Sequence, residues 1–89
     1  MSMSNNGLSK LTEEVGELQQ VIGKALAYGL DCKDHPDGGK PLEDRFVEEA
    51  GDVIASICFI MLKYNLNKDD LNARTSFKLA LYKEWDKKD

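Results

Sequence analysis

Two short acidic phrases carry the residue types most able to do chemistry in this chain. Each places two acids three residues apart inside an apolar, helix-like segment: Glu14 and Glu17 in the first, Glu49 and Asp52 in the second. On an α-helix, residues three apart share a face, about 60° apart around the axis. If the two helices face each other, the carboxylates converge. Carboxylates about 4 Å apart repel by roughly 4 kcal/mol at an effective dielectric near 20. Such a cluster therefore predicts divalent cations, and its oxygen ligands suit Mg²⁺ or Mn²⁺.

Either phrase alone has a simpler interpretation, because acids beside an apolar stripe usually form the solvated face of a helix. The recurrence of the same spacing on two consecutive helices favours a shared site. Each phrase also has a glycine just before its last acid, Gly16 and Gly51. Glycine inside a helix costs about 1 kcal/mol relative to alanine. The matched pair indicates either a ligand close to the backbone or tight helix–helix packing, and both alternatives stay open.

The chain is predicted to form one all-α domain over residues 1–89. Apolar residues recur every three or four positions, which predicts helices over about 6–29, 41–64 and 68–86. Turn-forming residues between the first two helices predict a loop and an antiparallel pair. A chain this short buries only about 60–65% of its unfolded surface. Its core is therefore expected to need a partner chain or a metal.

The apolar stripes of the three predicted helices indicate which faces are buried. The first stripe contains Leu8, Leu11, Val15, Leu18, Ile22 and Ala25. The second contains Phe46, Ala50, Val53, Ile57, Ile60 and Tyr64, and a further stripe on the same helix contains Val47, Ile54, Cys58 and Met61. So wide an apolar arc predicts burial on two sides, so we infer that oligomerisation completes a four-helix-bundle core. The third helix is expected to be capped by Asn67 and to bury Leu71, Phe77, Ala80, Leu81 and Trp85.

Composition excludes several other classes of protein. A net charge of −4 gives no basic face for nucleic acid. The longest apolar run, Val53–Leu62, is far shorter than the ~20 residues of a membrane span. The polar N-terminus does not resemble a signal peptide, and two cysteines, Cys32 and Cys58, make no disulfide framework. We expect a cytoplasmic, reduced protein that binds neither nucleic acid nor membrane.

The spacing of the four acids resembles the signature of the MazG-like all-α nucleoside triphosphate pyrophosphohydrolases, Glu-x-x-Glu followed after a loop by Glu-x-x-Asp. The wider phrases Leu11–Leu18 and Val47–Val53 match that pattern closely. Lys24 and the segments Tyr28–Leu30 and His35–Pro36 are most similar to small single-domain members from phages and bacteria. The resemblance covers most of the chain.

The resemblance implies that the four acids bind Mg²⁺, or Mn²⁺, and serve catalysis. It implies hydrolysis of an NTP or dNTP to the monophosphate and pyrophosphate, and assembly as a homodimer or a dimer of dimers. A triphosphate carries about four negative charges, so an acidic site needs metal ions to bind it. Metal-activated water would then attack the α-phosphorus. Which acid positions this water stays open, and Glu13 and Glu48 are further candidates.

Cationic side chains are expected to contact the phosphates of the nucleotide. The candidates are Lys78 and Arg74, which recur with Tyr82 every fourth residue of the third helix, and Lys24 near the end of the first. Lysine and arginine on helices more often only solvate a surface.

Two other functions remain compatible with the sequence. One is a non-catalytic helical dimerisation or regulatory module that retains a degenerate acidic site. The other keeps the fold and chemistry but takes a different substrate, such as phosphoribosyl-ATP, since fold analogy does not decide function.

Overall fold

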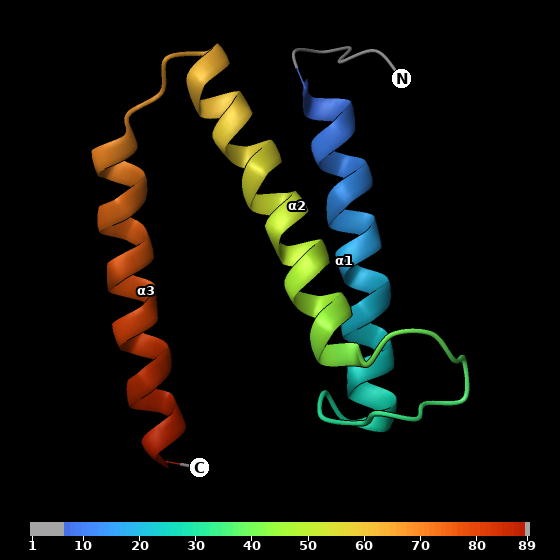
Figure 1. The fold of residues 1–89 in the computed structure, drawn as a ribbon. Coiled ribbons are helices and arrows are strands. Elements are labelled where there is room, and N and C mark those ends of the chain that lie inside the picture. The colour runs from blue at the N-terminus through green and yellow to red at the C-terminus, as the bar shows by residue number, and fades with distance from the viewer. Residues whose placement is uncertain (1–6, 89) are drawn as a thin grey trace.

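The computed structural model describes residues 7–88 of the chain, and these residues form three helices and no strand. They are α1 (Leu8–Tyr28), α2 (Leu42–Lys63) and α3 (Lys68–Lys88). Helices α1 and α2 lie side by side and antiparallel, joined by a long loop, and α3 follows α2 after a short turn (Figure 1). The all-α prediction is confirmed, and the helix ends agree to within two residues. The expected start of the first helix, at about residue 6, falls outside the described residues.

Local signals account for the helix boundaries. Gly29 ends α1 with a positive φ of 96°, and its N–H donates to the carbonyl of Ala25. Pro41 is the N-cap of α2, with an extended ψ of 148°, so α2 begins one residue later than the predicted range. Asn67 caps α3 as predicted, because its Oδ1 accepts a hydrogen bond of 3.0 Å from the N–H of Asp70.

The loop between α1 and α2 is anchored by His35, which is buried with 4% of its surface exposed. Its ring stacks on Tyr28 with the centroids 6.4 Å apart, and its Nε2 donates to the carbonyl of Lys40 at 3.2 Å. Ion pairs from Lys24 to Asp37 and from Lys33 to Glu43 tie the loop to both helices. His35 therefore anchors the loop by packing against α1.

The face that α1 turns toward α2 is rotated from the apolar stripe expected for it. Val21 is fully buried and Glu14 is 7% exposed, whereas Leu8, Val15 and Ile22 are between 39% and 47% exposed. The buried positions of α1 thus lie along the side of the expected apolar stripe that carries Glu14. On α2 the matching line contains Leu42 and Ser56, both buried. Glu14 therefore lies in the helix–helix interface, whereas Asp52 is exposed at its edge, and half of the predicted stripe remains accessible.

The second apolar stripe of α2 is mostly exposed in the single chain. Val47 is 71% and Ile54 is 61% exposed, and Cys58 is also exposed. Only Val21 and Leu42 are fully buried apolar side chains among the described residues. This pair of helices therefore has a very small core of its own.

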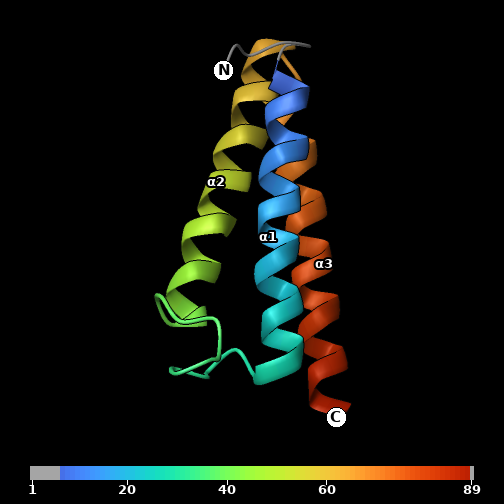
Figure 2. The same cartoon turned by 90° about the vertical axis from the view of Figure 1, so that its right-hand side faces the viewer.

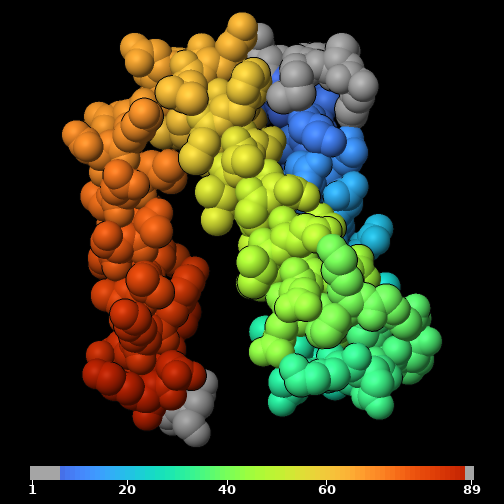
Figure 3. All heavy atoms as spheres, viewed as in Figure 1, coloured from blue at the N-terminus to red at the C-terminus, as the bar shows by residue number. Residues whose placement is uncertain are grey.

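Helix α3 stands apart from the other two, and open space separates its C-terminal half from α2 in the space-filling view (Figure 3). The expectation that it buries an apolar stripe is wrong for the single chain. Leu81 is partly buried, but the other four expected residues are exposed: Leu71, Phe77, Ala80 and Trp85. The physical reason is that no other helix of the same chain packs along α3 to cover these side chains.

The dimensions of the chain show the same lack of a closed core. The Cα radius of gyration is 15.7 Å, against about 12 Å for a compact domain of this length. The Cα atoms extend 42 × 39 × 15 Å, so the molecule is a flat layer little thicker than one helix, whose diameter is about 10–12 Å. The view turned by 90° shows the layer from its edge (Figure 2).

None of the helices formed by residues 7–88 is long and apolar enough to cross a membrane. Both cysteines, Cys32 and Cys58, are free thiols.

Candidate metal centre

The antiparallel pairing of α1 and α2 brings the two acidic phrases together. Glu14 and Glu17 on α1 and Glu49 and Asp52 on α2 each offer one carboxylate oxygen, and these oxygens all lie within 4.8 Å of one another. The spacing of three residues places each pair on one face of its helix. The helix pairing then turns both faces inward. The four acids expected to form one cluster are therefore adjacent in the structure.

Two of the carboxylates are only partly satisfied. Glu14 Oε2 and Glu49 Oε2 are buried, and neither has a hydrogen-bond partner within the described part of the chain. A buried polar atom without a partner carries a desolvation penalty of about 1–3 kcal/mol, and more when it is charged. The interface therefore contains acceptor atoms that a cation or a proton would stabilise.

The surroundings of Glu49 raise the pKa of its carboxyl group above the ordinary value. Burial is the largest cause, because it penalises the charged form. The neighbouring charges of Glu17 and Asp52 act in the same direction, as does a hydrogen bond that protonated Glu49 donates to Glu17. Without a cation, the cluster thus penalises the charged form of Glu49.

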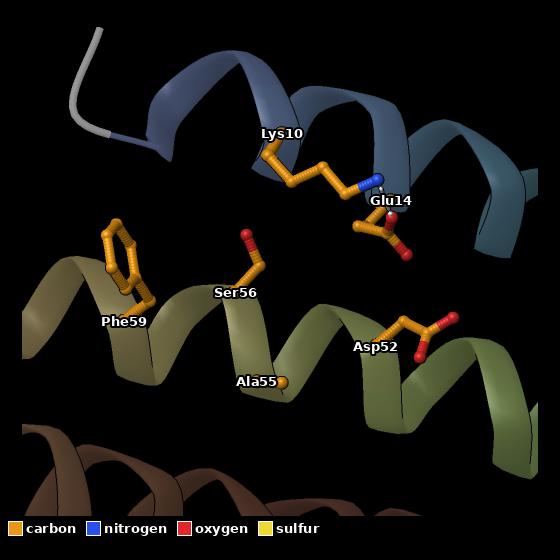
Figure 4. Close-up of a pocket in the computed structure, with 6 residues that line it drawn as sticks. All are labelled: Lys10, Glu14, Asp52, Ala55, Ser56 and Phe59. Carbon is orange, nitrogen blue, oxygen red and sulfur yellow. Dashed lines mark ion pairs between the residues drawn. The ribbon is translucent and has the colours of Figure 1, made fainter. Parts of the chain in front are cut away.

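One lysine that the sequence reasoning missed lies at this cluster. Lys10 Nζ is 3.0 Å from Glu14 Oε1 (Figure 4), and it is also 3.3 Å from Glu13 Oε1. The hydrogen bonds to Glu14 and then Glu13 raise the pKa of the Lys10 ammonium. The signal available in the sequence was the four-residue spacing of Lys10 and Glu14, which places them on one face of a helix.

The donor set fits a small divalent cation. Its four ligand atoms are carboxylate oxygens, the ligands that Mg²⁺ and Mn²⁺ prefer. Ligands on opposite sides of an octahedral Mg²⁺ are about 4.2 Å apart, so a spread of up to 4.8 Å needs only a small inward adjustment of the side chains. Two of these four residues, Glu14 and Glu49, also contain the buried carboxylate oxygens that have no hydrogen-bond partner. The residues present therefore fit Mg²⁺.

An open groove adjoins the acids between α1 and α2. Its volume is about 490 Å³, and its walls are Lys10, Glu14, Asp52, Ala55, Ser56 and Phe59. This volume falls within the range of small-molecule sites, about 300–1,000 Å³. Glu14 and Asp52 belong to both the cluster and the groove, and the hydroxyl of Ser56 points toward α1 (Figure 4). A ligand in this groove would touch the acidic cluster directly.

The three cations expected to bind phosphate lie elsewhere in the single chain. Lys24 pairs with Asp37 of the loop at 3.4 Å. Arg74 and Lys78 line a separate hollow on α3 and lie over aromatic rings of their own helix, 5.4 Å from the Phe77 centroid and 5.3 Å from the Tyr82 centroid respectively. Since α3 stands apart from α1, the fold does not bring Arg74 and Lys78 into the α1–α2 groove. Their phosphate contacts remain predictions.

The other candidates from the sequence also have definite places. Glu13 pairs with Lys10, and Glu48 pairs with Lys40 at 2.7 Å on the surface. A Cβ atom built on Gly16 or Gly51 meets no atom within 4 Å among the described residues. Tight packing within the chain therefore does not explain either glycine.

No protein-family model, curated protein or solved structure matches this chain.

Proposed function

We propose that this protein is a Mg²⁺-dependent nucleotide pyrophosphohydrolase that cleaves an NTP or dNTP to the monophosphate and pyrophosphate. The observation that carries the proposal is the convergence of four carboxylate oxygens within 4.8 Å of one another. A groove beside them has room for a nucleotide. The resemblance of both acidic phrases to the MazG-like signature supplies the reaction class.

Each acid has a defined part in this proposal. Glu14, Glu17, Glu49 and Asp52 hold the Mg²⁺, which when bound neutralises the polyphosphate and activates water near neutral pH. The side chains of the cluster also orient that water, because their free carboxylate oxygens accept its hydrogen bonds. The adjoining groove aligns the α-phosphorus with the acids for in-line attack, and pyrophosphate leaves toward solvent.

The proposal includes a homodimer, or a dimer of dimers, that completes a four-helix core. Two observations support it: the single chain is a layer 15 Å thick, and Val47 and Ile54 are 71% and 61% exposed on one side of α2. Monomeric soluble proteins rarely leave large contiguous apolar patches in water. A second copy packed against this side of α2 would cover these apolar side chains.

The test is a pyrophosphate-release screen over common and damaged nucleotides, with and without Mg²⁺. We expect metal-dependent release of pyrophosphate, not orthophosphate, from at least one nucleotide. Glu49→Ala and Asp52→Ala should abolish that activity while circular dichroism shows retained helices. Asp44→Ala removes an exposed acid from the first turn of the same helix and serves as the matched control. A panel that yields no pyrophosphate with Mg²⁺ or Mn²⁺ would refute the proposal.

The second candidate is a non-catalytic dimerisation or regulatory module, favoured by the exposed apolar stripe of α2. It differs in its prediction for calorimetry. The module shows no metal-dependent nucleotide binding, whereas the enzyme binds nucleotide only when Mg²⁺ or Mn²⁺ is present. Removal of the acids stabilises both, because it relieves the same repulsion.

A further inference from the structure

The groove between α1 and α2 contains two features that point to a ligand. Ser56 is 7% exposed, and its Oγ has no hydrogen-bond partner among residues 7–88. Its hydroxyl is directed into the space between the helices (Figure 4). Buried hydroxyls normally have partners, so this one is available to a polar group that enters the groove. Glu14 Oε2, equally buried and unpaired, belongs to the opposite wall, on α1 (Figure 4).

Lys10 is the cation that lines this groove. It also neutralises an acid of the metal centre, because its Nζ lies 3.0 Å from Glu14 Oε1. The side chain of Lys10 is 38% exposed, so the ammonium can move without disturbing the helix pair. An ammonium and a divalent cation bound to the same carboxylate repel each other, which weakens the contact between Lys10 and Glu14. Binding of a metal to Glu14 therefore releases Lys10 toward the groove.

We propose that Lys10 is an internal counter-ion of the cluster. When the metal binds, the Lys10 ammonium leaves Glu14 and pairs with a phosphate of the nucleotide. This inference rests on the proposed function. It makes the groove the site of the polyphosphate, with Lys10 as its positioning residue, and places the nucleoside toward Ser56 and Phe59. It also gives Lys10 a role both in the free protein and in the nucleotide complex. Lys10 screens the acids in the free protein and screens the phosphates in the complex.

The exchange has two consequences of opposite sign for Lys10→Gln. The variant loses a competitor for Glu14, so it binds the metal alone more tightly. It also loses a charged donor to phosphate, and charge-assisted hydrogen bonds are about twice as strong as neutral ones. It therefore binds a polyphosphate more weakly. A lysine that only solvated the surface would change neither affinity.

The experiment measures Mn²⁺ affinity by calorimetry, then the affinity of the Mn²⁺-loaded protein for inorganic tripolyphosphate, a probe that needs no knowledge of the base. For Lys10→Gln we expect Mn²⁺ to bind about tenfold more tightly and tripolyphosphate about tenfold more weakly, each equivalent to about 1.4 kcal/mol. Lys10→Arg keeps the charge and should stay near the wild type in both measurements.

Lys40→Gln is the matched control. It removes the same charge from another exposed ion pair, Lys40–Glu48, which does not line the groove. We expect its two affinities to stay within about twofold of the wild type, because an exposed ion pair contributes little and Lys40 does not line the groove.

The outcomes separate the two proposals. A wild type that binds no Mn²⁺ overturns the proposed function. A wild type that binds both probes, with Lys10→Gln indistinguishable from Lys40→Gln, overturns only the exchange by Lys10. Opposite shifts for Lys10→Gln with none for Lys40→Gln support the exchange.

Discussion

Lys10 Nζ lies 3.0 Å from Glu14 Oε1, while Oε2 of the same carboxylate is buried with no hydrogen-bond partner among the described residues. The lysine thus neutralises one edge of the cluster and leaves the other edge unsatisfied. Across the interface, Glu49 Oε2 is also buried and has no hydrogen-bond partner among the described residues. The metal-free cluster is therefore a destabilising element of the fold, and its properties can be measured without any substrate.

Glu49→Gln should stabilise the metal-free protein at pH 7. The pKa of Glu49 is raised above the ordinary glutamate value in the folded state, so folding is favoured while this group is protonated. The contribution of Glu49 to the free energy of unfolding is lost as the pH rises from its pKa in the unfolded chain through its raised pKa in the folded protein. The melting temperature of Glu49→Gln in EDTA should therefore exceed that of the wild type at pH 7, and the difference should shrink below about pH 4.

Glu84→Gln removes an exposed acid of α3 and should show no such pH-dependent gain. A Glu49→Gln protein less stable than the wild type at pH 7 would contradict the raised pKa and the repulsion behind it.

Ser56→Ala should stabilise the free protein by about 1 kcal/mol, because it removes a buried hydroxyl with no partner. The same change should raise KM for the nucleotide, since the hydroxyl lines the groove beside the acids. Urea unfolding and steady-state kinetics measure the two effects. Ser76→Ala, on an exposed face of α3, should change neither. A loss of stability in Ser56→Ala would show that the hydroxyl already has a partner.

Gly51→Ala should raise the helix stability of the isolated chain by about 1 kcal/mol, since an added Cβ meets no atom within 4 Å. If a ligand or a second copy approaches the backbone there, activity or association should fall in the same variant. Gly23→Ala is the matched control, because it is equally open but lies outside both acidic phrases. Equal gains in stability from both changes, with no effect of Gly51→Ala on activity or assembly, would leave Gly51 without a functional role.

Ile54→Lys should convert the assembly to monomers. Ile54 is 61% exposed in the single chain, on the apolar stripe of α2 that the proposed dimer buries, and a lysine there would have to bury an unpaired charge. Sedimentation velocity measures the change. Gln20→Lys, at an exposed polar position of α1, should leave the assembly intact. A wild type that sediments as a monomer would overturn the oligomer.

Much of the local structure could be predicted because it depends on neighbours along the chain. Asn67 caps α3 through its own side chain, and the recurrence of apolar residues every three or four positions predicted all three helices. The pairing of Glu14 with Glu17, and of Glu49 with Asp52, on one face follows from the helical repeat alone. The resemblance to the MazG-like signature could be read from the same short spacings.

Only the tertiary structure decided which face of each helix is buried. Val15 and Val21 are both apolar, yet Val21 is buried and Val15 is 44% exposed, because the pairing with α2 selects one edge of the helix. The same pairing buries Glu14, brings Lys10 to the groove and leaves Arg74 on a helix that stands apart. These relationships depend on contacts between residues distant in the sequence, which a helical period does not encode. A helix sequence determines what lies on each face, and packing determines what that face meets.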